Sequence, residues 1–89
     1  MNVELFGMAR ALAGVSHVEL AVDEPVAFPE FLRALADAVP ALVPDVVAPA
    51  ADALVEPNLL LLDGRRGLRD GETFGEADRP CILFLASGG

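Results

Sequence analysis

The chain has 89 residues, enough for one small domain but too few for two separate hydrophobic cores. Its 14 acidic and six basic residues give a formal net charge of −8, which repels nucleic-acid backbones and anionic membranes, so we expect neither as a partner. A hydrophobic fraction of 54% argues against disorder, and because no apolar run approaches the roughly 18 residues of a membrane span, we expect a cytoplasmic protein.

Two strands are expected at the start of the chain. Residues 2–6 alternate, with Val3 and Leu5 on one face, and residues 16–22 alternate in the same way. Residues 7–14 are bracketed by glycines and read either as a helical turn or as the connection of a wide hairpin. The two strands are therefore predicted to pair with each other as a hairpin.

The strongest helical signal lies in residues 26–39. Four apolar residues at spacings of four, three and four form one stripe: Phe28, Leu32, Leu35 and Val39. Pro29 is tolerated in the first helical turn, and Pro40 ends the helix because proline cannot continue it. One face of this helix is predicted to pack on a sheet, and the opposite, charged face to contact water.

The middle of the chain gives a weaker pattern. Segment 41–57 contains three prolines, which forbid a long helix and allow about one turn each at 45–48 and 50–54. Residues 58–62 are a compact apolar run, followed at 63–64 by an Asp-Gly pair, which is typical of a tight type I′ hairpin. We therefore expect a third strand, a turn and a short fourth strand.

A polar loop and a last strand complete the pattern. Residues 70–80 are polar and punctuated by glycine and proline, whereas residues 81–86 form an unbroken apolar run, as expected of a strand buried on both faces. The helix between the second and third strands allows this last strand to lie parallel to the first, in the middle of the sheet. The sequence therefore predicts an α+β roll, a mixed sheet with one main helix packed on one face, and a chain that leaves from the sheet centre.

The three residues after this strand, Ser87, Gly88 and Gly89, form the candidate functional site. Glycine has no Cβ, so a Gly-Gly end can thread a narrow channel that excludes larger residues. The group delivered there is the α-carboxylate of Gly89, which is ionised at neutral pH and is therefore a poor electrophile. A partner would have to activate this carboxylate before it could react.

Other candidate residues have plainer interpretations. His17 reads as a solvated strand residue and Cys81 as a small core hydrophobe, with any further role of Cys81 left open. Three arginines are expected to pair with neighbouring acids rather than to bind an anion: Arg65, Arg66 and Arg69. Four acids lack the ligand spacing of a calcium loop: Asp70, Glu72, Glu76 and Asp78. With one His, one Cys and no Lys in the chain, we expect no disulfide, no metal site and no bound cofactor.

Five features of the sequence resemble the MoaD/ThiS family of sulfur carriers, over nearly the whole chain. They are Asn2-Val-Glu-Leu-Phe-Gly-Met-Ala-Arg, His17-Val-Glu-Leu-Ala-Val, Phe28-Pro-Glu-Phe-Leu-Arg-Ala-Leu, Asn58 at the start of a strand, and the final Ser87-Gly88-Gly89. The chain looks more like MoaD than ThiS, because of its length and the Phe-Gly-Met-Ala-Arg-Ala-Leu-Ala-Gly stretch near its start.

The resemblance implies a single β-grasp, ubiquitin-like domain over residues 1–89, with a flexible tail at 87–89. It also implies that an E1-like adenylating enzyme, using ATP and Mg²⁺, converts the Gly89 carboxylate to an acyl-adenylate and that this becomes a thiocarboxylate. Sulfur would then pass to a MoaE-like or other synthase in cofactor biosynthesis, as for the small subunit of molybdopterin synthase. The chain would be a carrier rather than an enzyme, because the catalytic groups, ATP and metal belong to its partner.

Two other interpretations remain open. The chain could be a ubiquitin-like modifier attached through Gly89 to lysines of other proteins, or a plain interaction domain whose glycine tail is a cloning remnant. A thiocarboxylate on Gly89 would support the carrier, a covalent ladder on cellular proteins the modifier, and an encoded sequence that continues past Gly89 the plain domain. The sequence does not define the sulfur acceptor or the oligomeric state.

Overall fold

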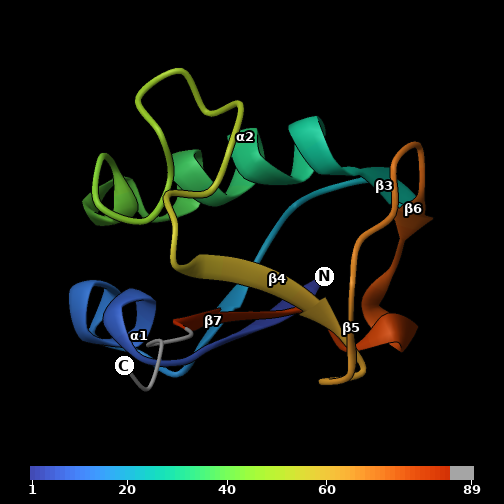
Figure 1. Ribbon diagram of the computed structural model, residues 1–89, viewed down its shortest axis with the longest axis horizontal. Coiled ribbons are helices and arrows are strands. Elements are labelled where there is room, and N and C mark those ends of the chain that lie inside the picture. The colour runs from blue at the N-terminus through green and yellow to red at the C-terminus, as the bar shows by residue number, and fades with distance from the viewer. Residues whose placement is uncertain (85–89) are drawn as a thin grey trace.

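A five-stranded mixed sheet with one long helix across it forms the body of the protein (Figure 1). The computed structural model describes residues 1–84. The sheet has the order β2-β1-β7-β4-β5, with the strands β1 (Asn2–Leu5), β2 (His17–Glu19), β4 (Asn58–Leu62), β5 (Arg66–Gly67) and β7 (Cys81–Phe84). The helix α2 (Phe28–Ala38) covers one face of this sheet, so the predicted α+β roll is confirmed.

The last described strand lies in the centre of the sheet. β7 pairs parallel with β1, where Glu4 faces Cys81 and Leu5 faces Ile82. On its other side β7 pairs antiparallel with β4 over all of residues 81–84. Both pairings confirm the predicted topology; residues 85 and 86 of the predicted strand lie outside the described residues.

The first two strands pair antiparallel, as predicted, with a short helix in their connection. This helix, α1 (Met8–Ala13), begins after Gly7 and ends at Gly14, whose φ angles are 61° and 76°. Glycine reaches positive φ at little cost, so these two residues allow the chain to turn at both ends of α1. β2 is shorter than predicted, because only three of residues 16–22 pair with β1.

The apolar stripe of α2 packs into the core, but the helix begins later than predicted. Its fully buried residues are Phe31, Leu32 and Leu35. Val26–Ala27, expected in the helix, instead form the strand β3, which pairs with β6 (Thr73–Phe74). The ring of Phe74 also packs edge-on against Phe31, with 5.2 Å between centroids. This long-range contact overrides the local helical pattern at residues 26–27.

The polar loop predicted at residues 70–80 contains regular structure. It holds β6 and the 3₁₀ turn η2 (Glu76–Asp78), in which the Asp78 carboxylate accepts a hydrogen bond from the Gly75 N–H at 2.9 Å. Phe74 is buried in the core. The segment is therefore polar as predicted, but the prediction that it lacks strands is wrong, because a two-residue strand is too short to show a sequence period.

Segment 41–57, whose structure the sequence left open, forms turns and bends at 45–48 and 50–54, where about one turn of helix was also allowed. Its first two residues belong to the 3₁₀ turn η1 (Pro40–Leu42). Further along, a single antiparallel β-bridge joins Val47 to Leu54. Val46 and Val47 are fully buried. Burial of these side chains, rather than a helical backbone, holds the proline-rich segment beside α2 (Figure 1).

The hairpin predicted after β4 is confirmed. Asp63 and Gly64 have φ angles of 57° and 66°, the positive values that a type I′ turn requires. The Arg65 N–H donates to the Leu62 carbonyl at 3.2 Å and closes the turn. β5 then pairs with only the last two residues of β4, Leu61 and Leu62.

We expect Leu35→Ala to lower the free energy of unfolding by about 2 to 5 kcal/mol, because it removes buried methyl groups and leaves a cavity between α2 and the sheet. Urea titration followed by circular dichroism measures this change. Leu12→Ala, at a side chain that is 37% exposed, is the control and should change stability by no more than about 0.5 kcal/mol. Equal effects of the two substitutions would contradict the packing described here.

Candidate functional site

The predicted functional residues Ser87, Gly88 and Gly89 lie outside the described residues, so the structure gives the strand that precedes them. β7 has a neighbouring strand on each side, and its last residue, Phe84, pairs with Asn58 of β4. A strand held by two hydrogen-bonded ladders is more firmly fixed than one at a sheet edge. β7 is therefore held on both sides at Cys81 and Ile82, and by β4 alone at residues 83 and 84.

The end of β7 packs against the start of α1 (Figure 1). A Cβ atom on Gly7 would lie 2.8 Å from the Cβ of Phe84, well inside normal carbon–carbon contact. The Phe6 N–H donates to the Ile82 carbonyl at 2.9 Å beside this contact. Gly7 is thus required both by its positive φ and by the close approach of Phe84, and it helps to fix where β7 ends.

The face of the sheet opposite α2 carries an apolar patch. Side chains alternate between the two faces of a strand, and directly paired residues share a face. In β4, alternate residues from Asn58 to Leu62 are buried toward α2, whereas Leu59 and Leu61 point to the other face. Leu59 pairs with Leu83 of β7. These three half-buried leucines, Leu59, Leu61 and Leu83, are called the open-face patch below.

Charged side chains continue this face across β1 and β2. Glu4 and His17 are cross-strand partners, with 3.8 Å between Oε2 and Nε2, and both side chains are about half exposed. His17 Nδ1 also lies 3.0 Å from the Ser16 hydroxyl. His17 is therefore a solvated strand residue, as predicted. Together with exposed Glu19, Glu4 gives the open-face patch an acidic margin.

Cys81 is a free, buried cysteine on the same face of β7, between Glu4 of β1 and Leu61 of β4. Burial, and to a smaller extent the negative charge of Glu4, raises the pKa of its thiol, which a hydrogen bond with the Leu61 backbone only partly opposes. The thiol therefore stays protonated at neutral pH. This is the behaviour of a core side chain, which agrees with the packing role predicted for Cys81.

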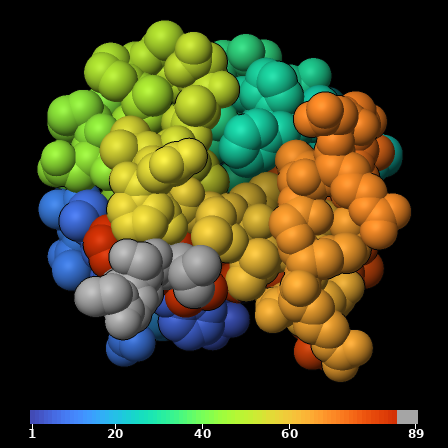
Figure 2. Space-filling view, viewed as in Figure 1, coloured from blue at the N-terminus to red at the C-terminus, as the bar shows by residue number. Residues whose placement is uncertain are grey.

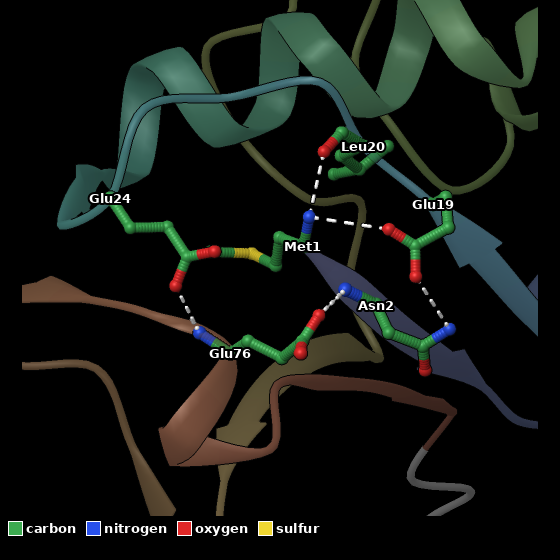
Figure 3. Close-up of polar contacts among 6 residues, drawn as sticks. All are labelled: Met1, Asn2, Glu19, Leu20, Glu24 and Glu76. Carbon is green, nitrogen blue, oxygen red and sulfur yellow. Dashed lines mark hydrogen bonds and ion pairs between the residues drawn. The ribbon is translucent and has the colours of Figure 1, made fainter.

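Several acids serve as hydrogen-bond acceptors that tie the start of β1 to its surroundings (Figure 3). The Met1 amine donates to the Leu20 carbonyl at 2.8 Å. The Asn2 N–H donates to Glu76 Oε1 at 2.7 Å, and the Glu76 N–H donates in turn to Glu24 Oε1 at 2.6 Å. These contacts join β1, the segment after β2 and η2, and they hold in place the strand that pairs with β7.

Arg66 and Glu72 form an ion pair with two parallel contacts, Nη1–Oε1 and Nη2–Oε2, each 2.8 Å long. The backbone N–H of Arg69 donates to the same carboxylate at 3.0 Å. The hydrogen bonds from Arg66 and then Arg69 lower the pKa of Glu72 from 4.5 to about 2, so this carboxylate is ionised at neutral pH. The predicted pairing with neighbouring acids is confirmed for Arg66.

Residues 1–84 contain no group of three or more His, Cys, Asp or Glu side chains arranged to hold a metal ion. No helix in this part of the chain is long and apolar enough to cross a membrane. The buried polar side chain of the described core is that of Asn58. The described residues therefore offer a fixed central strand and an apolar sheet face with an acidic margin, rather than a set of converging catalytic groups.

The residues of the open-face patch and the contact between Gly7 and Phe84 were not predicted from the sequence. The signal for the patch is present in β4, where four consecutive leucines place apolar side chains on both faces of one strand. The contact at Gly7 has no local signal, because it depends on β7, more than 70 residues further along the chain.

The first and last described strands in sequence, β1 and β7, pair parallel inside a mixed sheet, and one helix crosses this sheet. Together these features define a β-grasp fold of the ubiquitin-like class. No protein-family model and no curated protein matches the sequence. The crystal structure of SAMP1 from Haloferax volcanii is similar, with a TM-score of 0.77 and 27% sequence identity over 99% of this chain and 97% of that chain. A crystal structure of H. volcanii small archaeal modifier protein 1 has a TM-score of 0.76 and 25% identity over 96% and 95% of the two chains. The predicted β-grasp fold is thus confirmed, whereas greater similarity to MoaD than to ThiS stays a prediction.

We expect Gly7→Ala to destabilise the protein more than Gly14→Ala. Both glycines have positive φ, so both substitutions introduce backbone strain of about 1 kcal/mol or more, but only at Gly7 does a new Cβ meet another residue. The difference in the free energy of unfolding between the two variants measures the contact with Phe84. Equal losses would mean that the end of β7 does not press on Gly7.

Proposed function

We propose that this chain is a sulfur carrier whose Gly89 carboxylate is adenylated by an ATP-dependent E1-like enzyme and then converted to a thiocarboxylate. The observation that supports this most is the central position of β7, which β1 holds at Cys81 and Ile82 and β4 holds up to Phe84, five residues before Gly89. A fixed strand that leads to a Ser-Gly-Gly end suits delivery of a carboxylate into a partner's active site.

The proposed chemistry explains why activation comes first. A carboxylate oxygen of Gly89 attacks the α-phosphate of ATP, which forms the acyl-adenylate and releases pyrophosphate. Hydrosulfide then attacks the Gly89 carbonyl carbon, AMP leaves with the electrons of the bond that breaks, and loss of a proton leaves the thiocarboxylate. ATP, Mg²⁺ and the groups that stabilise these transition states are supplied by the activating enzyme, so this chain acts as the carrier and not as the catalyst.

The open-face patch and its acidic margin are the surface we assign to partner recognition. Leu59, Leu61 and Leu83 provide apolar area, and Glu4 and Glu19 provide charge at its edge. Apolar contacts of this kind set affinity, whereas charges at the margin mainly set the association rate. We propose that the E1-like enzyme uses this face first and that a sulfur-accepting, MoaE-like synthase uses it afterwards, with this chain as a small subunit similar to that of molybdopterin synthase.

A second function uses the same activated carboxylate. Both similar solved structures are of SAMP1, a small archaeal modifier protein, which favours attachment of Gly89 to lysines of other proteins. The lysine amine, rather than sulfur, would then attack the Gly89 carbonyl and displace AMP, or displace the thiolate of a thioester formed from it, and an isopeptide bond would form. This chain has no Lys and so offers no side-chain amine for polymers of itself, which limits each target lysine to a single copy joined in this way.

We expect Gly88→Val and Gly89→Val to fold normally but to lose about 100-fold or more in the rate of adenylation, because a side chain blocks a channel shaped for glycine. ATP–pyrophosphate exchange with the cognate E1-like enzyme measures this rate. Ala50→Val is the control, since Ala50 is exposed and lies in segment 41–57, outside the open-face patch. Tail variants activated as fast as the parent chain would remove both proposed functions.

We expect Leu61→Asp to weaken binding to the activating enzyme by about tenfold or more, because it places a charge in the centre of the apolar patch. Calorimetry with the activating enzyme in the absence of ATP measures the affinity. Val15→Asp, at an exposed apolar residue outside the patch, adds the same charge and should have a small effect. An equal loss in the two variants would show that net charge, and not the patch, governs binding.

A further inference from the structure

A groove with a volume of about 790 Å³ lies between α2 and the β4–β5 hairpin, on the helix side of the sheet. Its walls include Phe28 at the start of α2, Leu54, and Leu68 after β5. Figure 2 shows the hollow between the start of α2 and the segment that follows β5, with β4 at its base. Its volume is that of a binding site for a small molecule or a short peptide segment.

One edge of β4 is unpaired beside this groove. β5 pairs with β4 only at Leu61 and Leu62, and Figure 1 shows the chain after β5 rising away from the sheet toward β3. Within the described residues, no strand pairs with residues 58–60 on that side of β4, although these residues line the groove. The Asn58 N–H already donates to the Val55 carbonyl at 2.9 Å. The other backbone donors and acceptors of an unpaired edge can bind another extended chain.

Asn58 adds an unsatisfied acceptor at the same place. This residue is only 5% exposed and lines the groove. Its Nδ2 donates to the Val55 carbonyl at 2.8 Å, but within residues 1–84 its buried Oδ1 has no hydrogen-bond partner. A buried acceptor without a donor is costly, so a ligand that brings an N–H group to this position gains by satisfying it.

The start of α2 offers the complementary groups. α2 begins at Phe28 without a side-chain cap from Ala27, and both residues line the groove together with Pro29. The first turn of a helix leaves backbone N–H groups unpaired, and these are donors for a ligand carbonyl. Donors at α2 and an acceptor at Asn58 together match a peptide backbone, which carries both kinds of group.

The charges of the groove favour a basic segment. Glu56 and Asp70 are exposed carboxylates of the lining, and Glu72 is already paired with Arg66. Arg69 is a cation of the lining and is outnumbered there by Glu56 and Asp70, and the whole chain carries a net charge of −8. A second copy of this chain, which is equally acidic, and residues 85–89, which contain no basic side chain, lack the complementary charge.

We propose that this groove binds an extended basic peptide segment of a partner protein, which adds as a strand to the edge of β4 at residues 58–60. An apolar side chain of the segment packs against Phe28 and Leu68, a backbone N–H satisfies Asn58 Oδ1, and flanking Lys or Arg side chains face Glu56 and Asp70. This contact shares Leu59 with the open-face patch but does not involve Leu61, Leu83 or the chemistry of Gly89, so it stands or fails independently of the proposed function.

Titration of the isotope-labelled chain with the blocked peptide Lys-Val-Phe-Val-Arg, followed by NMR, tests the proposal. Amide shifts are expected at residues 58–60 and 68–72, with binding at least about tenfold tighter at low salt than that of blocked Glu-Val-Phe-Val-Glu. N-methylation of the central Phe, which removes a backbone donor, should weaken binding by a similar factor. Shifts centred on Leu61, Leu83 and His17 instead, or no saturable binding, would overturn the proposal.

Two variants with equal net charge separate the groove from general electrostatics. Glu56→Arg with Asp70→Arg reverses the charge of the groove rim, whereas Asp37→Arg with Asp45→Arg makes the same change at exposed positions outside it. The first variant should lose at least about tenfold in affinity for the basic peptide, and the second should lose much less. Equal losses, or a concentration-dependent dimer that occupies the groove, would show that the proposed occupant is wrong.

Discussion

The parallel pairing of β1 with β7 is the constraint on which the rest of the structure depends. It joins Leu5 to Ile82, near the two ends of the described chain, and so requires the chain between them to cross over the sheet. α2 fills that crossover, and β4 then closes the other side of β7. A strand in this position is fixed by two neighbours, and Gly7 is needed because α1 turns directly beside its end.

The elements that can be predicted from the sequence are those with a strong local pattern of apolar residues or turn residues. The stripe of α2, the Asp-Gly turn after β4 and the apolar run of β7 each carry a local signal, and their order leaves few topologies. β3 and β6 carry no such signal, because a strand of two residues has no period and exists only through the pairing of Val26 with Phe74. Segment 41–57 is held by the burial of Val46 and Val47, which its prolines do not reveal.

Different parts of the candidate site are predictable to different degrees. Ser87, Gly88 and Gly89 stand out in the sequence because three residues with little or no side chain follow a buried strand. The open-face patch becomes visible only when the register shows that Leu59 and Leu83 share a face. The groove depends on where β5 separates from β4, and Asn58 connects it to the end of β7, because this one residue both lines the groove and pairs with Phe84.

Intact-mass spectrometry of the chain after reaction with its cognate E1-like enzyme, ATP, Mg²⁺ and a sulfur donor tests whether Gly89 becomes a thiocarboxylate. A sulfur carrier is expected to gain the mass difference between sulfur and oxygen, and fragmentation is expected to place this change on Gly89. A chain that remains the unmodified acid, although the enzyme consumes ATP in its presence, or that gains sulfur at another residue, would rule out the proposed sulfur-carrier function.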